Sequence, residues 1–338
     1  MALRYRMRRS LFRICAFGTY GGEKIGQLPM MRTLFSCLLA LAVAGVGVRL
    51  SSAFDQKTAY EQALAKYQSK KYQEALAPAE EAVREDGGKA PSIHLYGLIL
   101  AALQRLEGAE ENLRKAAALA PDQAAFQYDL GYLLHQERKY VEAQPVLKRA
   151  VELDPENLMA RFMLARTYVF AYHELQIPNF VELTLEQLNY IVKKDPRFPA
   201  VHHHLALVYI NTGEQTKAIE ELNTEIRLYP GNTQARVELG ETMLRLNQYH
   251  KAAEEFLIAA KQAPQMPAIH YGLAKAYKAD GQNVKALAAG RRCVELDPRF
   301  ADGHYLLGQL YRDTEQAELA RQEFDLFRQL KSAAAPSR

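Results

Sequence analysis

A spacing of 34 residues runs through most of this 338-residue sequence. A small residue recurs in the same context eight times, and six of the seven intervals are 34 residues while one is 41. The eight positions are Ala63, Gly97, Gly131, Ala165, Ala206, Gly240, Ala274 and Gly308. A repeat of this length builds its core by stacking one unit on the next, so the chain need not divide into ordinary globular domains.

Each copy of the repeat predicts a pair of antiparallel helices. Apolar residues recur at spacings of three and four in two runs, for example Leu130 and Leu134 in one run and Leu147 in the next. Polar residues separate the two runs, and a proline ends most copies because proline cannot continue a helix. Small residues such as Gly131 and Ala143 are expected where the two helices approach closely. The predicted fold class is therefore all-α, an α-solenoid of stacked helix-turn-helix units.

Two copies show most clearly which residue types recur. One contains Tyr140, Ala143, Ala150 and Pro155, and another contains Leu239, Gly240, Tyr249, Ala252, Phe256, Ala259 and Pro264. This pattern resembles the tetratricopeptide repeat family. The resemblance implies about eight repeats that stack into a right-handed superhelix, and it implies protein binding rather than catalysis.

Three features depart from the family pattern. The family's early tryptophan is absent, because the chain contains no tryptophan. The first copy has Lys66 where a large residue is usual, as expected of a repeat at the end of an array. In the fifth copy Glu225 stands at a position of the second helix that is otherwise small, which argues against the usual packing at that point.

The fourth copy contains seven extra residues between its helices, within residues 171–180. Two more helical turns followed by a turn at Pro178-Asn179 would lengthen this hairpin. One interpretation is a tolerated insertion, because loop length adds little entropic cost. The other is a projecting ledge that contacts a partner, for which Tyr172 and Phe180 are the candidate residues.

A short apolar segment lies near the N-terminus. Its fifteen residues, Leu34–Val48, are too few to cross a bilayer as a helix, which takes roughly 20 residues. Arg32 precedes this segment, and the small residues Ser51 and Ala53 follow it in a pattern that suits a signal peptidase. We predict a signal peptide that is cleaved after Ala53, and the alternative is an uncleaved membrane anchor.

The predicted organisation has four segments. They are an upstream extension from a wrongly assigned start codon (1–29), the signal peptide (30–53), an eight-repeat array (54–331) and a disordered tail (332–338). The mature protein is expected in the periplasm or outside the cell. If the apolar segment is kept, the protein is expected to be membrane-anchored and to face the periplasm.

Charge and cysteine content narrow the function further. Residues 1–53 hold eight of the 43 Lys and Arg and one of the 39 acids, which leaves 35 bases and 38 acids, or −3, for the rest of the chain. A mildly acidic array argues against nucleic-acid binding. Three cysteines are too few for a disulfide framework, and Cys293 is expected to be buried and inert.

Motifs that carry enzyme chemistry are missing from the sequence. There is no phosphate loop, dinucleotide fingerprint, GxSxG or HExxH. His202, His203 and His204 are adjacent, so on a helix they point about 100° apart and cannot converge on one metal ion. No catalytic residue, metal site or cofactor is predicted, and the chain is not expected to be an enzyme.

The resemblance places a partner-binding groove on the first helices. Inward residues then lie three before, one after and four after each small residue. Those expected to contact a protein or peptide partner are Tyr60, His94, Tyr128, Tyr132, His135, Phe162, Arg166, His203, Tyr271, Lys275, Lys278, Tyr305 and Arg312. Tyr128, Tyr132 and Phe162 are expected to form a group of three exposed rings, the kind of anchor that dominates binding energy.

The function that follows is a non-enzymatic scaffold or adaptor that binds an apolar or amphipathic segment in this groove. The alternative is a membrane-tethered structural component of an envelope assembly, which uses its edges or the insertion of the fourth copy. A membrane is a partner only if the signal segment is not cleaved.

Processing of the N-terminus can be tested directly. We expect native material to begin at Phe54, because the apolar segment is short and small residues precede the predicted cleavage point. N-terminal sequencing of the native protein checks this expectation, and a protein that begins at Met1 in the cytoplasm contradicts it.

Overall fold

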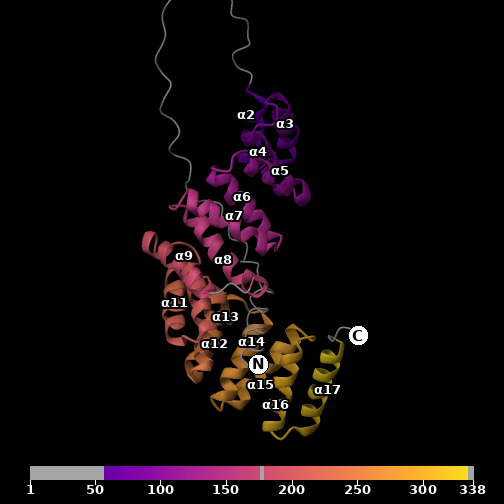
Figure 1. Cartoon of the computed structure of the whole chain (residues 1–338). Coiled ribbons are helices and arrows are strands. Elements are labelled where there is room, and N and C mark those ends of the chain that lie inside the picture. The colour runs from indigo at the N-terminus through magenta and orange to yellow at the C-terminus, as the bar shows by residue number, and fades with distance from the viewer. Residues whose placement is uncertain (1–56, 176–178, 334–338) are drawn as a thin grey trace, which may run out of the picture. The chain divides into compact units, whose positions relative to one another are not determined.

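The structure, a computed structural model, describes residues 57–175 and 179–333, with side chains described through Phe170 in the first of these ranges. Within these ranges all regular secondary structure is helical, and sixteen helices labelled α2 to α17 follow one another in pairs (Figure 1). The predicted all-α fold of stacked helix pairs is confirmed. The predicted upstream extension and signal peptide lie outside the described residues, as does most of the tail.

The chain divides into two compact units, and the division falls after Ala116. The helices of the first unit are α2 (Ala59–Gln68), α3 (Tyr72–Glu85), α4 (Ala90–Ala102) and most of α5 (Leu106–Leu119). A cluster around Ala63, Ala75 and Ile99 forms the core between its helices. The capping box of Thr58 and Glu61 closes the N-terminus of α2.

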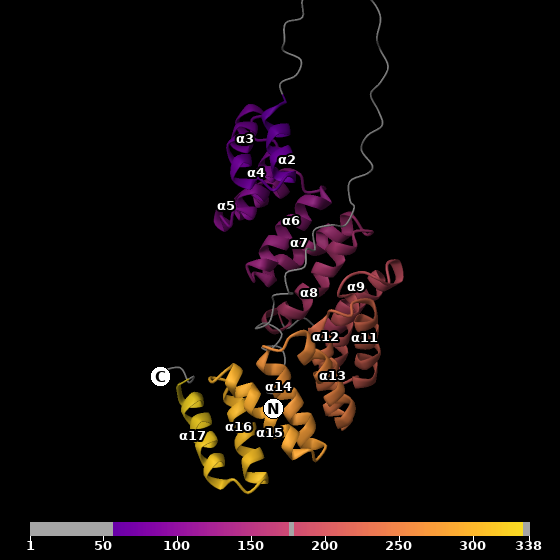
Figure 2. The same ribbon diagram turned by 180° about the vertical axis from the view of Figure 1, so that it is seen from behind.

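The second unit contains six further pairs. Its helices are α6 (Ala124–Gln136), α7 (Tyr140–Leu153), α8 (Leu158–Leu175), α9 (Phe180–Lys194), α10 (Val201–Thr212), α11 (Gln215–Leu228), α12 (Thr233–Arg245), α13 (Tyr249–Gln262), α14 (Pro267–Ala279), α15 (Asn283–Leu296), α16 (Ala301–Asp313) and α17 (Ala317–Ala333). Each helix contacts the next one along the chain, and first helices of adjoining pairs also touch, as α12 touches α14 and α14 touches α16. Figure 2 shows these pairs from behind.

The small residue of each copy lies on the first helix of a pair, and in the four copies where it is glycine it lies opposite a large residue of the second helix. A Cβ added at Gly131 would lie 2.6 Å from Leu147, and one added at Gly240 would lie 2.8 Å from Phe256. Such distances are shorter than real Cβ contacts, so glycine is needed for the two helices to approach this closely. The predicted packing role of the small residues is confirmed.

Phe256 is the most tightly held of these large residues. Its ring is fully buried and lies between Gly240 of its own pair and Gly272 of the next pair, where an added Cβ would come within 2.5 Å of the ring. One ring therefore packs two successive first helices. Cys293 of α15 is also fully buried, and burial raises the pKa of its thiol to about 12, as expected for an inert cysteine.

The turn inside each pair has a backbone feature that the sequence pattern does not reveal. One residue of every such turn adopts a left-handed conformation, and these residues keep the spacing of the repeat: Lys70, Gln104, Arg138, Asn179, Gly213, Asn247, Gly281 and Glu315. In the third copy the amide after the left-handed residue, that of Lys139, donates to the carbonyl of Leu134 at 2.9 Å. This is the Schellman arrangement, which satisfies carbonyls at the helix end.

The insertion of the fourth copy lengthens the first helix of its pair. α8 has 18 residues, whereas α6 has 13. α8 is thus five residues longer, about one and a half turns rather than the two predicted, and Asn179 enters α9 in the left-handed conformation. Pro178 and the side chain of Tyr172 lie outside the described residues. At the other end, α17 runs to Ala333, past the predicted end of the array at residue 331.

The contact between Gly240 and Phe256 gives a test of the packing. We expect Gly240→Leu to lower the free energy of unfolding by about 1–3 kcal/mol, because the added side chain forces Phe256 out of its site. Gly231→Leu is the matched control, since a Cβ there meets no atom within 4 Å. Urea unfolding of both variants checks this, and equal midpoints for the two variants contradict it.

Candidate functional site

Two tyrosines on the first helix α6 form an exposed aromatic surface. Tyr128 is half-buried, and Tyr132 is 41% exposed. Their ring centroids lie 6.2 Å apart and the rings are tilted by 36°. Residues four apart share one face of a helix, so the two rings form one continuous apolar surface, as the sequence predicts.

Phe162 of α8 lies inside the fold. It is 8% exposed, and its ring packs 5.3 Å from that of Phe198 and 4.7 Å from that of His204. The guanidinium of Arg166 lies 5.9 Å from the same ring. The predicted group of three exposed rings is therefore wrong for Phe162, which residues of the turn before α10 and of α10 itself cover, and it reduces to exposed Tyr132 with half-buried Tyr128.

His135 is part of a buried polar and aromatic cluster between α6 and α8. Its Nδ1 lies 2.9 Å from Thr167 Oγ1, and Thr167 in turn donates to the carbonyl of Met163. The imidazole therefore donates from Nδ1. Tyr140 and Phe170 stack beside it with centroids 5.1 Å apart. Burial, helped by the nearby charge of Arg166, lowers the pKa of His135 to about 3 and keeps the ring neutral.

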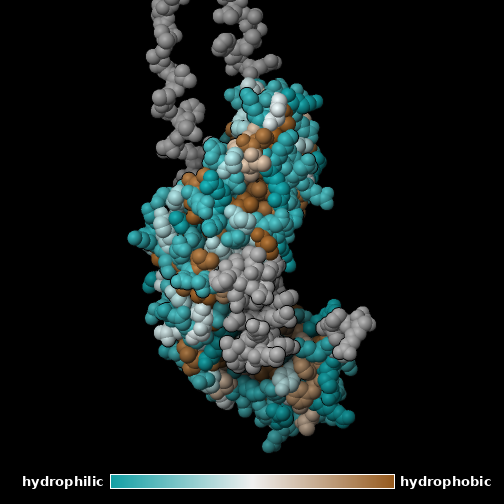
Figure 3. Space-filling model, in the orientation of Figure 1, coloured by the Kyte–Doolittle hydropathy of each residue, from teal (hydrophilic) through white to brown (hydrophobic). Residues whose placement is uncertain are grey.

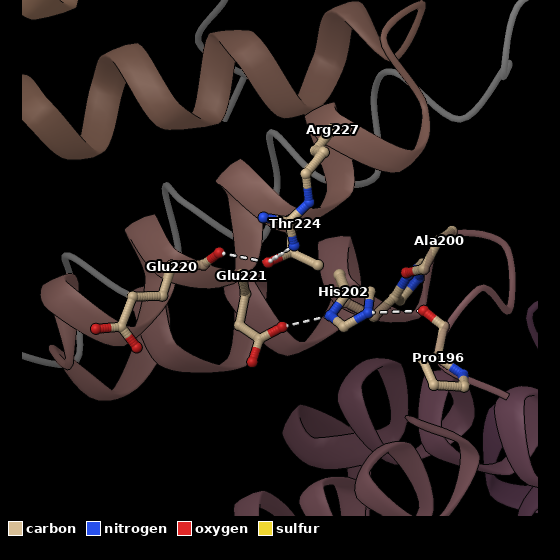
Figure 4. Close-up of polar contacts among 8 residues, drawn as sticks. Pro196, Ala200, His202, Glu220, Glu221, Thr224 and Arg227 are labelled. Atoms are coloured by element: carbon tan, nitrogen blue, oxygen red, sulfur yellow. Dashed lines mark hydrogen bonds and ion pairs between the residues drawn. The ribbon is translucent and has the colours of Figure 1, made fainter. Parts of the chain in front are cut away.

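The three adjacent histidines of α10 have different surroundings. His203 is 5% exposed, and burial lowers its pKa to about 4. His204 donates from Nδ1 to the carbonyl of Ala200 at 2.9 Å, and burial lowers its pKa to about 3. His202 instead contacts Glu221 of α11 (Figure 4). Among the described residues, no three His, Cys, Asp or Glu side chains are placed to hold a metal ion.

His202 instead ties its helix pair together. Its Nε2 lies 3.0 Å from the carbonyl of Pro196 and its Nδ1 lies 2.6 Å from Glu221 Oε2 (Figure 4). Because both ring nitrogens face acceptors, the charged imidazolium is favoured. The hydrogen bond to Glu221 accordingly raises the pKa of His202.

The same polar tie recurs in other copies at a fixed spacing. His304 lies 2.9 Å from the carbonyl of Pro298 and 2.6 Å from Glu323, and Arg236 donates to Glu255 at 3.0 Å. In each of these pairs the acid lies 19 residues after the base. This series was not predicted, although the spacing of 19 residues from base to acid recurs in the sequence.

The basic residues of α14 and α16 have partners of their own. Lys278 donates to Gln309 at 2.8 Å and pairs with Asp313 at 3.2 Å. Arg312 also lies 3.6 Å from Asp313, with most of its side chain exposed. The ammonium of Lys275 lies 5.4 Å from the centroid of Tyr271, and this ring packs edge-on against Phe300. Of the five residues predicted on these two helices, Lys278 and Arg312 thus share Asp313, and Lys275 lies over Tyr271.

The remaining predicted residues lie in three places. Tyr305 of α16 is 45% exposed and packs against Phe324 and Phe327. Tyr60 and His94 are half-buried on α2 and α4 of the first unit. Phe180 is half-buried at the start of α9.

The rest of the visible surface is mixed in character. On the face shown in Figure 3, hydrophobic residues form separate small areas among hydrophilic ones. Among the residues that the structure describes, no helix combines the length and the apolar character needed to cross a bilayer.

Known proteins with similar sequences contain the same kind of repeated helix pair. The tetratricopeptide repeat family profile matches residues 96–157 and 237–299. Anaphase-promoting complex subunit 3 of Schizosaccharomyces pombe is 22% identical over 194 residues, which cover 56% of this chain and 28% of that protein. The chain thus spans little more than a quarter of the length of this relative.

Two solved structures share the fold. A tetratricopeptide repeat protein from Parabacteroides merdae aligns with a TM-score of 0.56 at 18% identity over 73% of this chain and 94% of that chain. The Cut9–Hcn1 hetero-tetramer aligns with a TM-score of 0.55 at 14% identity over 77% of this chain and 50% of that chain. Proteins built from these repeats generally mediate protein–protein interactions. The profile match and the helix pairs at 34-residue spacing show that this chain contains tetratricopeptide repeats.

Proposed function

We propose that this chain is a non-enzymatic adaptor that binds an apolar or amphipathic segment of a partner protein on the first helices of its second unit. The observation that carries the proposal is the ring pair of half-buried Tyr128 and exposed Tyr132 on α6. Exposed aromatic rings on one helix face offer a large apolar contact with few rotatable bonds. A helical or extended segment laid across such a face is a common mode of peptide recognition.

The relatives support a role in assembly. Anaphase-promoting complex subunit 3, the first of these relatives, is named as a subunit of a multi-protein complex. The repeats occupy most of the chain, which leaves no described segment of the size of a catalytic domain. An adaptor role agrees with both observations.

The positive charge on α14 and α16 suggests which residues the other end of the bound segment carries. Lys275 and Arg312 extend from these helices, and Arg312 keeps most of its side chain in solvent. Acidic residues at one end of the partner segment would complement these two cations. The partner we propose is therefore apolar at one end and acidic at the other.

The place of action that we propose is the periplasm or the extracellular space. The short apolar segment Leu34–Val48, with Ser51 and Ala53 after it, supports export and cleavage after Ala53. Retention of this segment as an anchor is the alternative, and N-terminal sequencing of native material separates the two.

A selected peptide can test the aromatic surface. A phage-displayed library of random peptides is panned against the mature chain, and the Kd of the tightest peptide is measured by calorimetry. We expect Tyr128→Ala combined with Tyr132→Ala to cost about 1–3 kcal/mol of binding free energy, because aromatic anchors dominate such contacts. Helix content by circular dichroism should stay unchanged.

The matched control for this double variant is Leu257→Ala. Leu257 is 41% exposed, as Tyr132 is, but it lies on the second helix α13. Loss of affinity in the tyrosine variant and not in the control supports the proposal. Equal affinity of the tyrosine variant and the parent chain shows that α6 is not the binding surface.

Charge reversal tests the basic region. We expect Lys275→Glu to slow association of an acidic selected peptide several-fold at low salt, with little change in the dissociation rate, because exposed charges act mainly on encounter. Lys261→Glu on α13 changes the net charge equally and serves as the control. Stopped-flow measurement at two salt concentrations checks this, and equal slowing by both variants contradicts a local role for Lys275.

A further inference from the structure

Glu225 is a buried carboxyl group at a position that is apolar in other copies. It is 1% exposed in the last turn of α11. The equivalent residues Ala150, Ala259 and Cys293 are equally buried and lie on α7, α13 and α15. A carboxyl group at this position costs desolvation that an alanine does not, so it needs polar partners within the fold.

The partners of Glu225 come from the first helices of two different copies. Its Oε1 accepts a hydrogen bond from Asn232 Nδ2 at 2.8 Å. Asn232 is the N-cap of α12, where its Oδ1 accepts from the amide of Ala235 at 3.1 Å. The same carboxyl group interacts with the backbone N–H of His203, in the first turn of α10. One side chain of α11 thus joins the N-termini of α10 and α12.

The N-terminus of α10, close to this carboxyl group, lacks a side-chain cap of its own. Its N-cap is Ala200, which has a left-handed backbone and no side-chain hydrogen bond. A helix leaves its first amides without partners inside the helix. The Glu225 carboxyl group supplies an acceptor there that the local sequence does not provide.

One carboxyl oxygen of Glu225 has lost its hydration without gaining a hydrogen bond from the described residues in return. Oε2 is buried and has no hydrogen-bond partner in the part of the chain that the structure describes. In the ionised form this oxygen carries charge without a donor, whereas in the protonated form Oε1 can still accept from Asn232. Burial accordingly raises the pKa of Glu225, against the opposing effects of Asn232, His203 and His202.

Charged and titratable groups lie around Glu225 on each neighbouring helix and turn. They are His202 and His203 on α10, Glu221 on α11, and Tyr229 with Arg197 and Asp195 in the adjoining turns. His202 is held by Glu221, one turn before Glu225 on the same helix, and its charge favours ionised Glu225 (Figure 4). Burial lowers the pKa of His203 to about 4, so this group stays neutral above pH 5.

We propose that Glu225 is a proton-operated latch between the fifth and sixth copies, which closes when its carboxyl group is protonated and loosens when the group ionises. The closed latch holds the N-termini of α10 and α12 against α11. α10 and α12 are neighbouring first helices and belong to the surface proposed above. The latch therefore changes how firmly these two helices are held within that surface. The latch itself does not depend on what that surface binds.

The sign of the pH effect follows from linkage. The pKa of Glu225 in the closed arrangement is raised above the value of 4.5 of a water-exposed carboxyl group, so proton uptake favours closure. Its contribution to closure is lost as the pH rises through the raised pKa. The raised pKa of His202 acts in the same direction, since its pair with Glu221 is lost as the pH rises through that pKa.

Hydrogen exchange of the full chain, followed by mass spectrometry at several values between pH 5 and 8, tests the latch. Rates are corrected for the intrinsic pH dependence of exchange. We expect the first turns of α10 and α12 to open more often as the pH rises, by up to about tenfold for each unit by which the pKa is raised. In Glu225→Gln this dependence should shrink to the part that comes from His202.

The chain contains a matched control junction. Asn157 caps the turn that begins α8, through a hydrogen bond from Ala160 at 3.0 Å, and Ala150 stands where Glu225 would be. Exchange at the first turn of α8 should therefore depend on pH to the same extent in the parent chain and in Glu225→Gln.

Two further variants keep the test decisive. Glu225→Ala installs the residue found in other copies and should remove the same pH dependence if Glu225→Gln does not fold. His202→Gln removes the charge that favours ionised Glu225, so it should shift the remaining midpoint to higher pH. The proposal is overturned if parent and Glu225→Gln show the same pH dependence in α10 and α12.

Discussion

Close approach of the two helices of a pair at a small residue of the first helix is the constraint on which the array depends. Where Gly240 meets Phe256, the helices approach so closely that a Cβ does not fit, and the same ring also packs Gly272 of the next copy. Packing within a pair and packing between pairs thus share one side chain. The 34-residue spacing of the small residues in the sequence arises because this close approach is repeated along the chain.

This constraint explains why the fold was predictable from the sequence while the site was only partly so. The identity and spacing of Gly131 and its equivalents specify which helix faces meet, and the structure confirms them. Exposure of an inward residue depends in addition on its neighbours in the next copy. Tyr132 is exposed, whereas Phe162, chosen by the same positional rule, is covered by Phe198 and His204.

Polar interactions inside the array were harder to anticipate for a different reason. The 19-residue spacing from His202 to Glu221 recurs in the sequence, but it indicates a contact only once both helices are placed in register. The role of Glu225 was still less visible, because the sequence marks it only as a departure from a small residue. Its neighbours Asn232 and His203 belong to two different helices, which the fold alone brings to the same carboxyl group.

The left-handed residues in the turns have a consequence for how such a chain can change. Of the eight positions, only Gly213 and Gly281 are glycine, and the others include Lys70, Arg138 and Glu315. The hydrogen bonds of the turn, rather than the absence of a side chain, hold the backbone there. Within the second unit, four of the six turns therefore carry a side chain at this position, and its chemistry varies while the backbone stays the same. Arg138, Asn179, Asn247 and Glu315 are thus positions where one side chain can be exchanged for another without a change in the helices on either side.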